Sequence, residues 1–329
     1  MSRILITGAN GFIGSHIVET LIAMKNHHII CVVRKTSNLK WIKKLSVEYR
    51  YGDLVDKNFL NTIVENVDII IHCAGIIRAV NKNEYFKINS KVTKNLCTAI
   101  LKKNHNLKKM IFISSQASMG PTMMTSNIKK MYDTCNPISS YGLSKFIAES
   151  EIKETLYNKV PYTILRPAAV YGPRDKDIFI LFNLIHKHLK PITITKRLLQ
   201  LVYVKDVANS VAACLENKKT DNNVYYLANS EIYTWEDIGN VIASSVGIKT
   251  IPLPIPNFIL KFVGLAYELF SYISKKPVIL NSQKIDELLQ KYWIADTDPA
   301  KNDLNVKFTS LEVASKITYN WYLLNGFFR

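Results

Sequence analysis

The sequence predicts an α/β protein in which a doubly wound parallel sheet is joined by a smaller C-terminal α+β domain. Three observations favour this class. Residues 4–16 have the pattern of a buried strand, a glycine turn and a helix start. Short β-branched runs then alternate with segments of helical spacing as far as residue 167, as in a parallel sheet. The 329 residues, 48% of them hydrophobic, suffice for about two domains or one large α/β unit.

The glycine turn carries the first functional signal. It reads Thr7-Gly8-Ala9-Asn10-Gly11-Phe12-Ile13-Gly14. Its three glycines allow a tight turn, a close approach of backbone to a pyrophosphate, and packing of the new helix on its strand. The helix N-terminus would face the phosphates. Glycines at this spacing can also serve packing alone, but the strand-turn-helix context favours a dinucleotide-binding βαβ unit.

The end of the second strand, expected at residues 29–33, bears on cofactor choice. An acidic residue there would bind the adenosine ribose hydroxyls, whereas Arg accommodates a 2′-phosphate. Residues 20–47 contain no acidic residue, and Arg34, Lys35 and Ser37 follow the strand. These side chains suit a phosphate, although a solvated basic loop would have the same composition. We therefore predict NADP (NADPH) as the cofactor, with NAD as the alternative.

Further elements of the sheet follow along the first half of the chain. Strands are expected at residues 47–51, 68–75 and 109–115, with a helix at residues 84–101. Asp53 follows the first of these strands, where it could accept from the adenine amino group or cap the next helix. Residues 68–75 end in Cys73-Ala74-Gly75, whose small side chains would let the backbone approach the cofactor.

A tyrosine and a lysine supply the candidate chemistry. Tyr141 and Lys145 are four residues apart, hence on one face of the helix that begins after Pro137. A tyrosine with its ordinary pKa of about 10 is a poor base at neutral pH, and an adjacent cation lowers that pKa. The spacing alone is common on helix surfaces. The catalytic interpretation of this spacing is favoured here because the helix follows a strand that ends in Ser114-Ser115.

Together these motifs resemble the extended short-chain dehydrogenase/reductase superfamily, and within it the NAD-dependent epimerase/dehydratase family. The resemblance covers essentially the whole chain and implies a Rossmann sheet. It rests on the glycine pattern, Ser115, Tyr141-x-x-x-Lys145, Arg166-Pro167-x-x-Val170-Tyr171-Gly172-Pro173, Val202-Tyr203-Val204-Lys205-Asp206-Val207-Ala208, Trp293-Ile294-Ala295-Asp296 and Trp321-Tyr322.

The resemblance implies a role for each catalytic candidate. Ser115 would hydrogen-bond the substrate oxygen and Tyr141 would give or take its proton. Lys145 would hold the nicotinamide ribose and lower the pKa of the tyrosine. Asn89 would support a water-linked proton path, and Ser114 would support the cofactor.

The expected cofactor contacts come from the strand ends and the glycine turn. They are Gly8, Asn10, Gly11, Phe12, Ile13, Gly14, Arg34, Lys35, Ser37, Asp53, Leu54, Cys73, Ala74, Gly75, Ser114, Tyr141, Lys145, Pro167, Ala169 and Val170.

Three departures from the sugar-nucleotide members bear on the substrate. Those members usually have an Asn where this chain has Ala169, and an Arg where it has Leu199 or Gln200, although Arg197 lies close. A further Arg is often found where this chain has Tyr292-Trp293. The ligands for a sugar-nucleotide diphosphate therefore look absent, and the pattern is closest to dihydroflavonol-reductase-like and 3-beta-hydroxysteroid-dehydrogenase-like members, whose substrates are less polar.

We therefore predict an NADP-dependent oxidoreductase that transfers a hydride between nicotinamide and a carbonyl or secondary alcohol of a fairly apolar small molecule. One alternative is an NAD-dependent nucleotide-sugar epimerase or dehydratase. A second is a non-catalytic NADP-binding regulatory protein, and the intact Ser115, Tyr141 and Lys145 weigh against it. Fold alone does not decide between them.

Two apolar stretches agree with an apolar substrate. The loop at residues 117–137 carries four methionines that could line an apolar pocket, or form no ligand site: Met119, Met123, Met124 and Met131. Residues 258–270 are too interrupted by charge to span a membrane and are expected to pack as a lid or substrate-domain helix.

Composition limits the partners. The net charge of +17 comes from dispersed lysines, so we expect no nucleic-acid partner and at most a peripheral membrane contact. Five scattered cysteines predict no disulfide or metal site. The N-terminal apolar run is too short for a secretory signal, so we expect a cytoplasmic protein. A homodimer is possible.

The predicted domain division is discontinuous. The dinucleotide-binding domain would comprise residues 1–170 and 199–230, with strands near 201–204 and 224–228 joining its first half. The substrate domain would comprise residues 171–198 and 231–329. Ligand would bind between them, at the carboxyl ends of the parallel strands.

Overall fold

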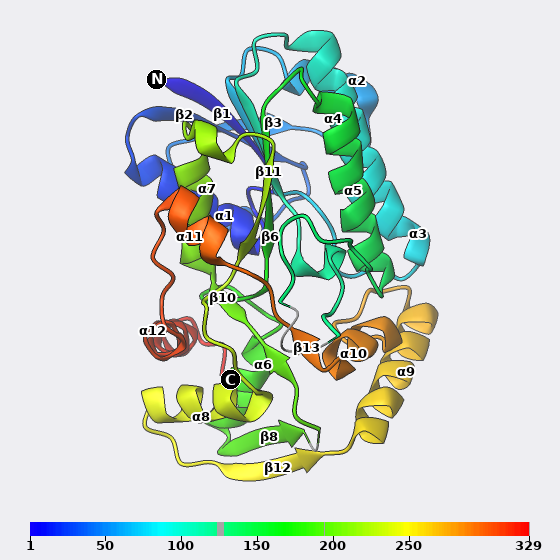
Figure 1. Cartoon of the computed structure of the whole chain (residues 1–329), viewed down its shortest axis with the longest axis vertical. Helices are drawn as coiled ribbons and strands as arrows, with labels where there is room; N and C mark the ends of the chain where they lie inside the picture. The colour runs from blue at the N-terminus through cyan, green and yellow to red at the C-terminus, as the bar shows by residue number, and fades with distance from the viewer. Residues whose placement is uncertain (124–127, 194, 329) are drawn as a thin grey trace.

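A parallel sheet organises the computed structural model, which describes residues 1–123, 128–193 and 195–328. In this part of the chain seven strands form the sheet in the order β11-β6-β5-β4-β1-β2-β3 (Figure 1). They are β1 (Ser2–Thr7), β2 (His27–Val33), β3 (Glu48–Tyr51), β4 (Ile69–His72), β5 (Lys109–Ile113), β6 (Tyr162–Pro167) and β11 (Asn223–Leu227). The order reverses between β1 and β4, which makes their carboxyl ends the topological switch point where ligands bind in such sheets. The predicted fold class is confirmed.

Helices cover both faces of the sheet, because successive strand side chains point to opposite sides. Ile4 and Ile6 of β1 pack on one side, and Leu5 between them packs on the other. The first side is covered by α1 (Phe12–Ala23), α7 (Val204–Cys214) and α11 (Asp298–Leu304), the second by α2 (Lys57–Ile63), α4 (Val92–Lys103) and α5 (Ser140–Leu156) (Figure 1).

The helix expected at residues 84–101 is interrupted. It consists of α3 (Lys82–Tyr85), a π-helical turn η1 (Phe86–Lys91) and α4. Such turns often mark functional sites in helices, and Asn89 lies in this one. Two short 3₁₀ turns, η2 (Gln116–Ser118) and η3 (Lys218–Thr220), follow β5 and α7.

One predicted strand lies outside the main sheet. Residues 224–228 join the main sheet as β11, but residues 201–204 do not. β11 already occupies the free edge of β6, so β10 (Leu201–Tyr203) pairs instead with β7 (Ala169–Tyr171), which continues the chain beyond β6.

A second, aromatic-rich core lies among α6 (Phe179–His186), α8 (Trp235–Ser245) and α12 (Leu311–Leu324) and the short strands β7, β9 (Leu198–Leu199) and β10. Two further strand pairs lie here, β8 (Leu189–Thr193) with β12 (Ile251–Ile255) and β9 with β13 (Tyr292–Trp293). Figure 1 shows them below the main sheet with these three helices and with α9 (Asn257–Ser274) and α10 (Ser282–Leu289). None of the helices in the described ranges is long and apolar enough to cross a bilayer.

Two expectations about apolar segments need correction. The methionines do not gather into one pocket, because Met119 is buried beside Tyr226 whereas Met123 is exposed; Met124 lies outside the described residues. Residues 258–270 form α9 as expected, but its large apolar side chains face away from the protein.

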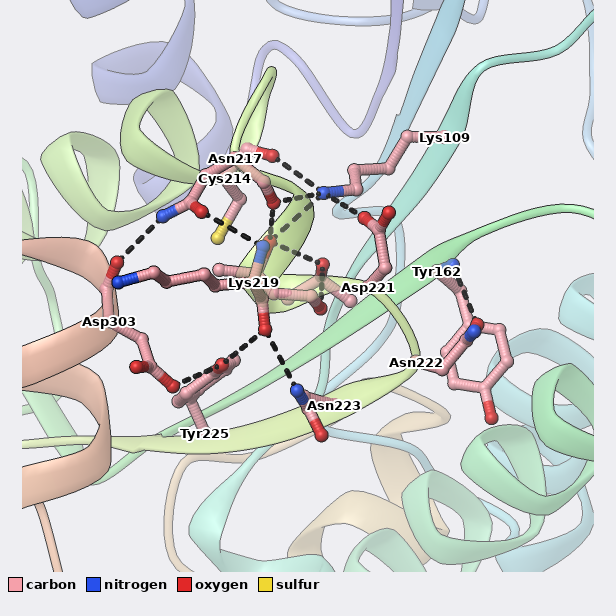
Figure 2. Close-up of polar contacts among 12 residues, drawn as sticks. Lys109, Tyr162, Cys214, Asn217, Lys219, Asp221, Asn222, Asn223, Tyr225 and Asp303 are labelled. Atoms are coloured by element: carbon pink, nitrogen blue, oxygen red, sulfur yellow. Dashed lines mark hydrogen bonds and ion pairs between the residues drawn. The ribbon is translucent and has the colours of Figure 1, made fainter.

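Lys109, at the start of β5, ties the sheet to a segment more than a hundred residues later (Figure 2). Its buried Nζ donates to the carbonyl oxygens of Cys214 (3.0 Å) and Asn217 (2.9 Å) and to Thr220 Oγ1 (2.9 Å). An ion pair with Asp221 at 2.5 Å compensates the charge. A buried ammonium needs such a complete set of partners, and its removal leaves them unpaired.

We expect Lys109→Met to lower the free energy of unfolding by about 3 kcal/mol, because it leaves Asp221 and two carbonyls without their donor. Urea denaturation measures the change. The matched control is Lys108→Met, next along the chain, whose side chain is 64% exposed and paired with Asp68; exposed pairs are worth about 0 to 1 kcal/mol. Equal losses in the two variants would contradict the assigned role of Lys109.

Candidate active site

The glycine turn packs against the end of β4 with no room for side chains. Gly8 has a φ of +71°, and a Cβ there would lie 2.7 Å from the backbone nitrogen of Ala74. A Cβ on Gly14 would lie 2.1 Å from the carbonyl oxygen of Gly8. These two glycines are therefore required for packing, which agrees with the first and third glycine roles in dinucleotide turns.

Gly11 has a different environment. It is exposed, it is the N-cap of α1 without a side-chain cap, and a Cβ there would meet only the Gly8 carbonyl oxygen, at 3.2 Å. The N–H groups of a first helical turn have no intrahelical acceptor, so this end of α1 offers donors and a positive dipole to an anion. The residues present therefore fit a bound pyrophosphate.

A buried hydrogen-bond chain fixes the ends of β1 and β4. Thr93 Oγ1 donates to the Asn89 carbonyl (2.6 Å) and lies 3.0 Å from His72 Nε2. His72 Nε2 must then donate, and Nδ1 accepts from Thr7 Oγ1 at 2.7 Å. Burial lowers the pKa of His72 to about 3, so the imidazole is neutral and serves to position both strand ends.

Asn89 and Lys145 lie together beneath Gly75. Asn89 Nδ2 donates to Ile76 O (3.0 Å) and Ser144 Oγ (2.9 Å), and its Oδ1 accepts from Ile76 N at 2.8 Å. A Cβ on Gly75 would lie 3.0 Å from Asn89 Oδ1 and 3.7 Å from Lys145 Nζ. The amide therefore shapes the small-residue strand end that sequence reasoning assigned to the cofactor.

Tyr141 lies at the start of α5, close to the end of β5. Ser139 caps the helix by accepting from Gly142 N at 3.0 Å. A Cβ on Gly142 would lie 2.4 Å from the Ala117 carbonyl oxygen, so only glycine allows α5 to approach η2 this closely. The approach brings the Tyr141 phenol near the Ser115 hydroxyl, which acts to lower the pKa of the phenol.

The electrostatics of this pair differ from the sequence expectation. Burial raises the pKa of Tyr141 to about 12, although the Ser115 hydrogen bond and the Lys284 charge oppose the rise. Lys145 is not among the groups that shift this pKa; its Nζ donates to the Ile113 carbonyl at 2.6 Å, and burial lowers its own pKa to about 8. At neutral pH the phenol therefore keeps its proton.

Helix α10 reaches the same place, which sequence reasoning missed. Gln283 Oε1 accepts from Ser140 N at 2.9 Å, and Glu287 accepts from the Ser139 hydroxyl. Lys284 Nζ pairs with Glu287 Oε2 at 2.9 Å. The contacts with Ser139 and Ser140 join residues more than 140 positions apart, and no motif marks α10.

Tyr85 of α3 is a second neighbour that the sequence did not single out. Its ring meets the Tyr141 ring edge-on, with centroids 6.1 Å apart, and its hydroxyl donates to Ile77 O at 3.5 Å. The Ile77 side chain is 57% exposed. The Tyr141 ring therefore has an aromatic neighbour.

Ser114 faces away from the predicted cofactor contacts. Its hydroxyl donates to Glu149 of α5, which also accepts from Ser118 Oγ at 2.8 Å. Arg166 Nη2 donates to Glu149 Oε2 at 2.6 Å, and both residues are 1% exposed. The Arg166 charge holds the Glu149 pKa below its usual range despite burial. The proton of the Ser114 hydroxyl is thus engaged in this buried network.

The loop after β2 lies beside the glycine turn. Asn10 Nδ2 donates to Asn38 O at 3.4 Å. Arg34 N donates to Ser37 Oγ at 3.0 Å, and the side chains of Arg34 and Lys35 are exposed and absent from the ion pairs of the described residues.

Asp53 neither caps α2 nor lies buried. Its Oδ1 accepts from Val55 N at 3.0 Å, and Asp56 caps the helix by accepting from Asn58 N at 2.8 Å. The second oxygen of Asp53 is therefore available to a ligand.

The remaining predicted cofactor residues line the same strand ends, and most are half-buried. Pro167 is buried at the end of β6 and Ala74 adjoins Gly8, while the others are Phe12, Ile13, Leu54, Cys73, Ala169 and Val170.

At positions where sugar-nucleotide members usually have ligands for the diphosphate, this chain has side chains that form hydrogen bonds within the protein. Gln200 Oε1 accepts from Ala295 N at 2.8 Å, and Trp293 Nε1 donates to Glu287 O at 2.9 Å. Arg197 is buried, with Nη2 donating to Asn257 Oδ1 at 2.6 Å and Nη1 lacking a partner among the described residues.

Comparison with known proteins identifies the family. Residues 4–228 match the model of the NAD dependent epimerase/dehydratase family. The chain is 26% identical over 272 residues to UDP-glucose 4-epimerase of Vibrio cholerae, covering 79% of this chain and 81% of the relative. It is 24% identical over 324 residues to ceramide reductase of Caulobacter vibrioides, covering 98% and 95%. The crystal structure of gox2253 superposes with a TM-score of 0.82, at 24% identity and full coverage of both chains. This chain therefore belongs to the NAD dependent epimerase/dehydratase family, and it is an NAD(P)-dependent enzyme of the extended short-chain dehydrogenase/reductase type.

Proposed function

We propose that the protein is an NADP-dependent oxidoreductase that reduces a carbonyl, or oxidises a secondary alcohol, in a fairly apolar small molecule. The observation that carries the proposal is the set of side chains at the positions where sugar-nucleotide members usually have ligands for the diphosphate. Ala169 has no polar side chain, and Gln200 and Trp293 are hydrogen-bonded within the protein. A sugar nucleotide would lack its usual partners there, and buried polar groups without partners are costly.

The proposed mechanism uses Tyr141 as the acid. A bound nicotinamide supplies or accepts the hydride. In reduction, Tyr141 donates its Oη proton to the substrate oxygen as the carbonyl carbon gains the hydride, and Ser115 donates a hydrogen bond to the same oxygen. The raised pKa of Tyr141, about 12, keeps the phenol in the form that this direction needs. Lys145 would hold the nicotinamide ribose, and Asn89 would support the return of a proton.

The surroundings of Tyr141 support an apolar substrate. The Tyr85 ring adjoins it, and Ile77, whose carbonyl oxygen accepts from the Tyr85 hydroxyl, is exposed. Burial of one such aliphatic side chain against a substrate contributes about 1.5 to 3 kcal/mol. The match to a ceramide reductase along 98% of this chain agrees with a substrate of this kind.

One observation favours a nucleotide-sugar epimerase or dehydratase as the second candidate. Arg197 is buried, and its Nη1 has no partner among the described residues. A guanidinium with a free donor is suited to a diphosphate. The relative from Vibrio cholerae, a UDP-glucose 4-epimerase, agrees with this alternative.

Tyr141→Phe tests the acid. The variant keeps the ring and removes the proton, so turnover should fall by about 10² to 10⁴, while NADPH affinity should stay near the wild-type value. The assay follows NADPH absorbance with a panel of apolar ketones and aldehydes. Tyr85→Phe is the matched control and should keep most of its activity, because the variant retains the ring that contacts Tyr141 and removes only a hydroxyl that donates to the Ile77 carbonyl at 3.5 Å. An active Tyr141→Phe enzyme would refute the mechanism.

Arg34→Asp tests the choice of NADP. Reversal of the charge should weaken NADPH binding by at least about tenfold relative to NADH, since a phosphate pair of this kind is worth about 1.5 to 3 kcal/mol. Calorimetric titration gives both affinities. Lys43→Asp makes a comparable charge reversal at an exposed position farther along the same loop and should leave the ratio nearly unchanged. If the ratio is the same in both variants, Arg34 does not recognise the phosphate.

A further inference from the structure

Helix α9 is amphipathic, but its small and polar residues face the protein and its large apolar residues face outward. Its face toward α10 carries Gly264, Glu268 and Ser271, and a Cβ on Gly264 would lie 2.7 Å from Ile285 Cγ1. Glu268 accepts from Ser282, on the protein side. The helix thus buries its small and polar residues, whereas an ordinary surface helix buries its apolar ones.

The outward face of α9 carries a stripe of large apolar side chains at helical spacing. Between 60% and 78% of each is exposed. The seven residues in this range are Phe258, Phe262, Leu265, Leu269, Phe270, Tyr272 and Ile273. Figure 1 shows α9 beside α10 at the outer edge of the molecule. An exposed apolar patch of this kind marks an interaction surface.

The charges around the stripe are all positive. Lys261 lies on the helix, and Lys275 and Lys276 follow its end; all three are exposed. The acidic residue of the helix, Glu268, is turned inward. Since the whole chain carries a net charge of +17, a second copy of it would be repelled from this face, while an anionic surface would be attracted.

We propose that α9 docks the protein on the surface of an anionic lipid bilayer. An apolar stripe flanked by lysines is the pattern of helices that lie in the plane of the membrane interface. The aromatic and aliphatic side chains of α9 enter the acyl boundary, and its lysines contact the lipid headgroups. The helix cannot span the bilayer, so the attachment is peripheral.

Docking there places the candidate active site close to the membrane. Glu268 and Ser271 of α9 line a small cavity whose opposite wall includes Tyr85, and the ring of Tyr85 contacts that of Tyr141. An apolar substrate dissolved in the bilayer would then lie near the phenol. This last step alone rests on the proposed function; the docking itself does not.

Vesicle sedimentation tests the docking without cofactor or substrate, so its result is independent of the proposed reaction. The probes are vesicles of phosphatidylcholine alone and of phosphatidylcholine with phosphatidylserine. The full-length protein should sediment with the anionic vesicles and dissociate as salt screens the lysines. Phe262→Glu/Leu269→Glu should weaken binding by at least about a hundredfold, and Lys275→Gln/Lys276→Gln by about fivefold per lysine.

The matched control is Val313→Glu/Ile317→Glu on α12, which makes the same charge change at two exposed apolar positions and should leave vesicle binding unchanged. Three outcomes would overturn the proposal: no sedimentation of the wild-type protein, an equal loss in the α9 and α12 variants, or a wild-type dimer that the α9 variant alone converts to monomer in sedimentation velocity. The last would show that a second copy covers the stripe.

Discussion

The contact between the glycine turn and the end of β4 is the constraint on which the rest of the site depends. A Cβ on Gly8 or on Gly14 would lie less than 3 Å from a backbone atom. The elements β1, α1 and β4 can therefore meet only if both positions lack side chains. The meeting point is where the strand order reverses. Helix α1 therefore presents its N-terminus, and β5 and α5 bring Ser115 and Tyr141 to the same edge of the sheet.

Buried polar networks hold this edge in place. His72 joins β1 to η1 through two threonines, and Glu149 joins α5 to β6 through Arg166. The polar groups of each network have hydrogen-bond partners. A buried polar group without a partner would cost free energy. The Arg-Pro motif that contributes to the family pattern thus has a structural reason in this chain, which is to compensate the buried Glu149.

Local patterns in the sequence predicted most of the sheet and the catalytic candidates. Glycine spacing, β-branched runs and the Tyr141–Lys145 interval are short-range signals. What they could not predict depends on distant pairings. β10 leaves the main sheet because β11 already fills the edge of β6, Ser114 turns toward Glu149, and α10 reaches Ser139 from far along the chain. The exposure of α9 was missed since hydrophobic spacing does not reveal which face is buried.

The central claim is that the site at the strand ends binds NADPH and an apolar substrate and not a sugar nucleotide. The most direct test is calorimetric titration of the purified protein with NADPH, NADH and UDP-glucose in turn, after a spectroscopic check for carried-over nicotinamide. The account predicts tighter binding of NADPH than of NADH and no binding of UDP-glucose, because Gln200 and Trp293 are committed within the protein. Retained NAD together with UDP-glucose binding, lost on Arg197→Ala, would contradict it and favour the epimerase.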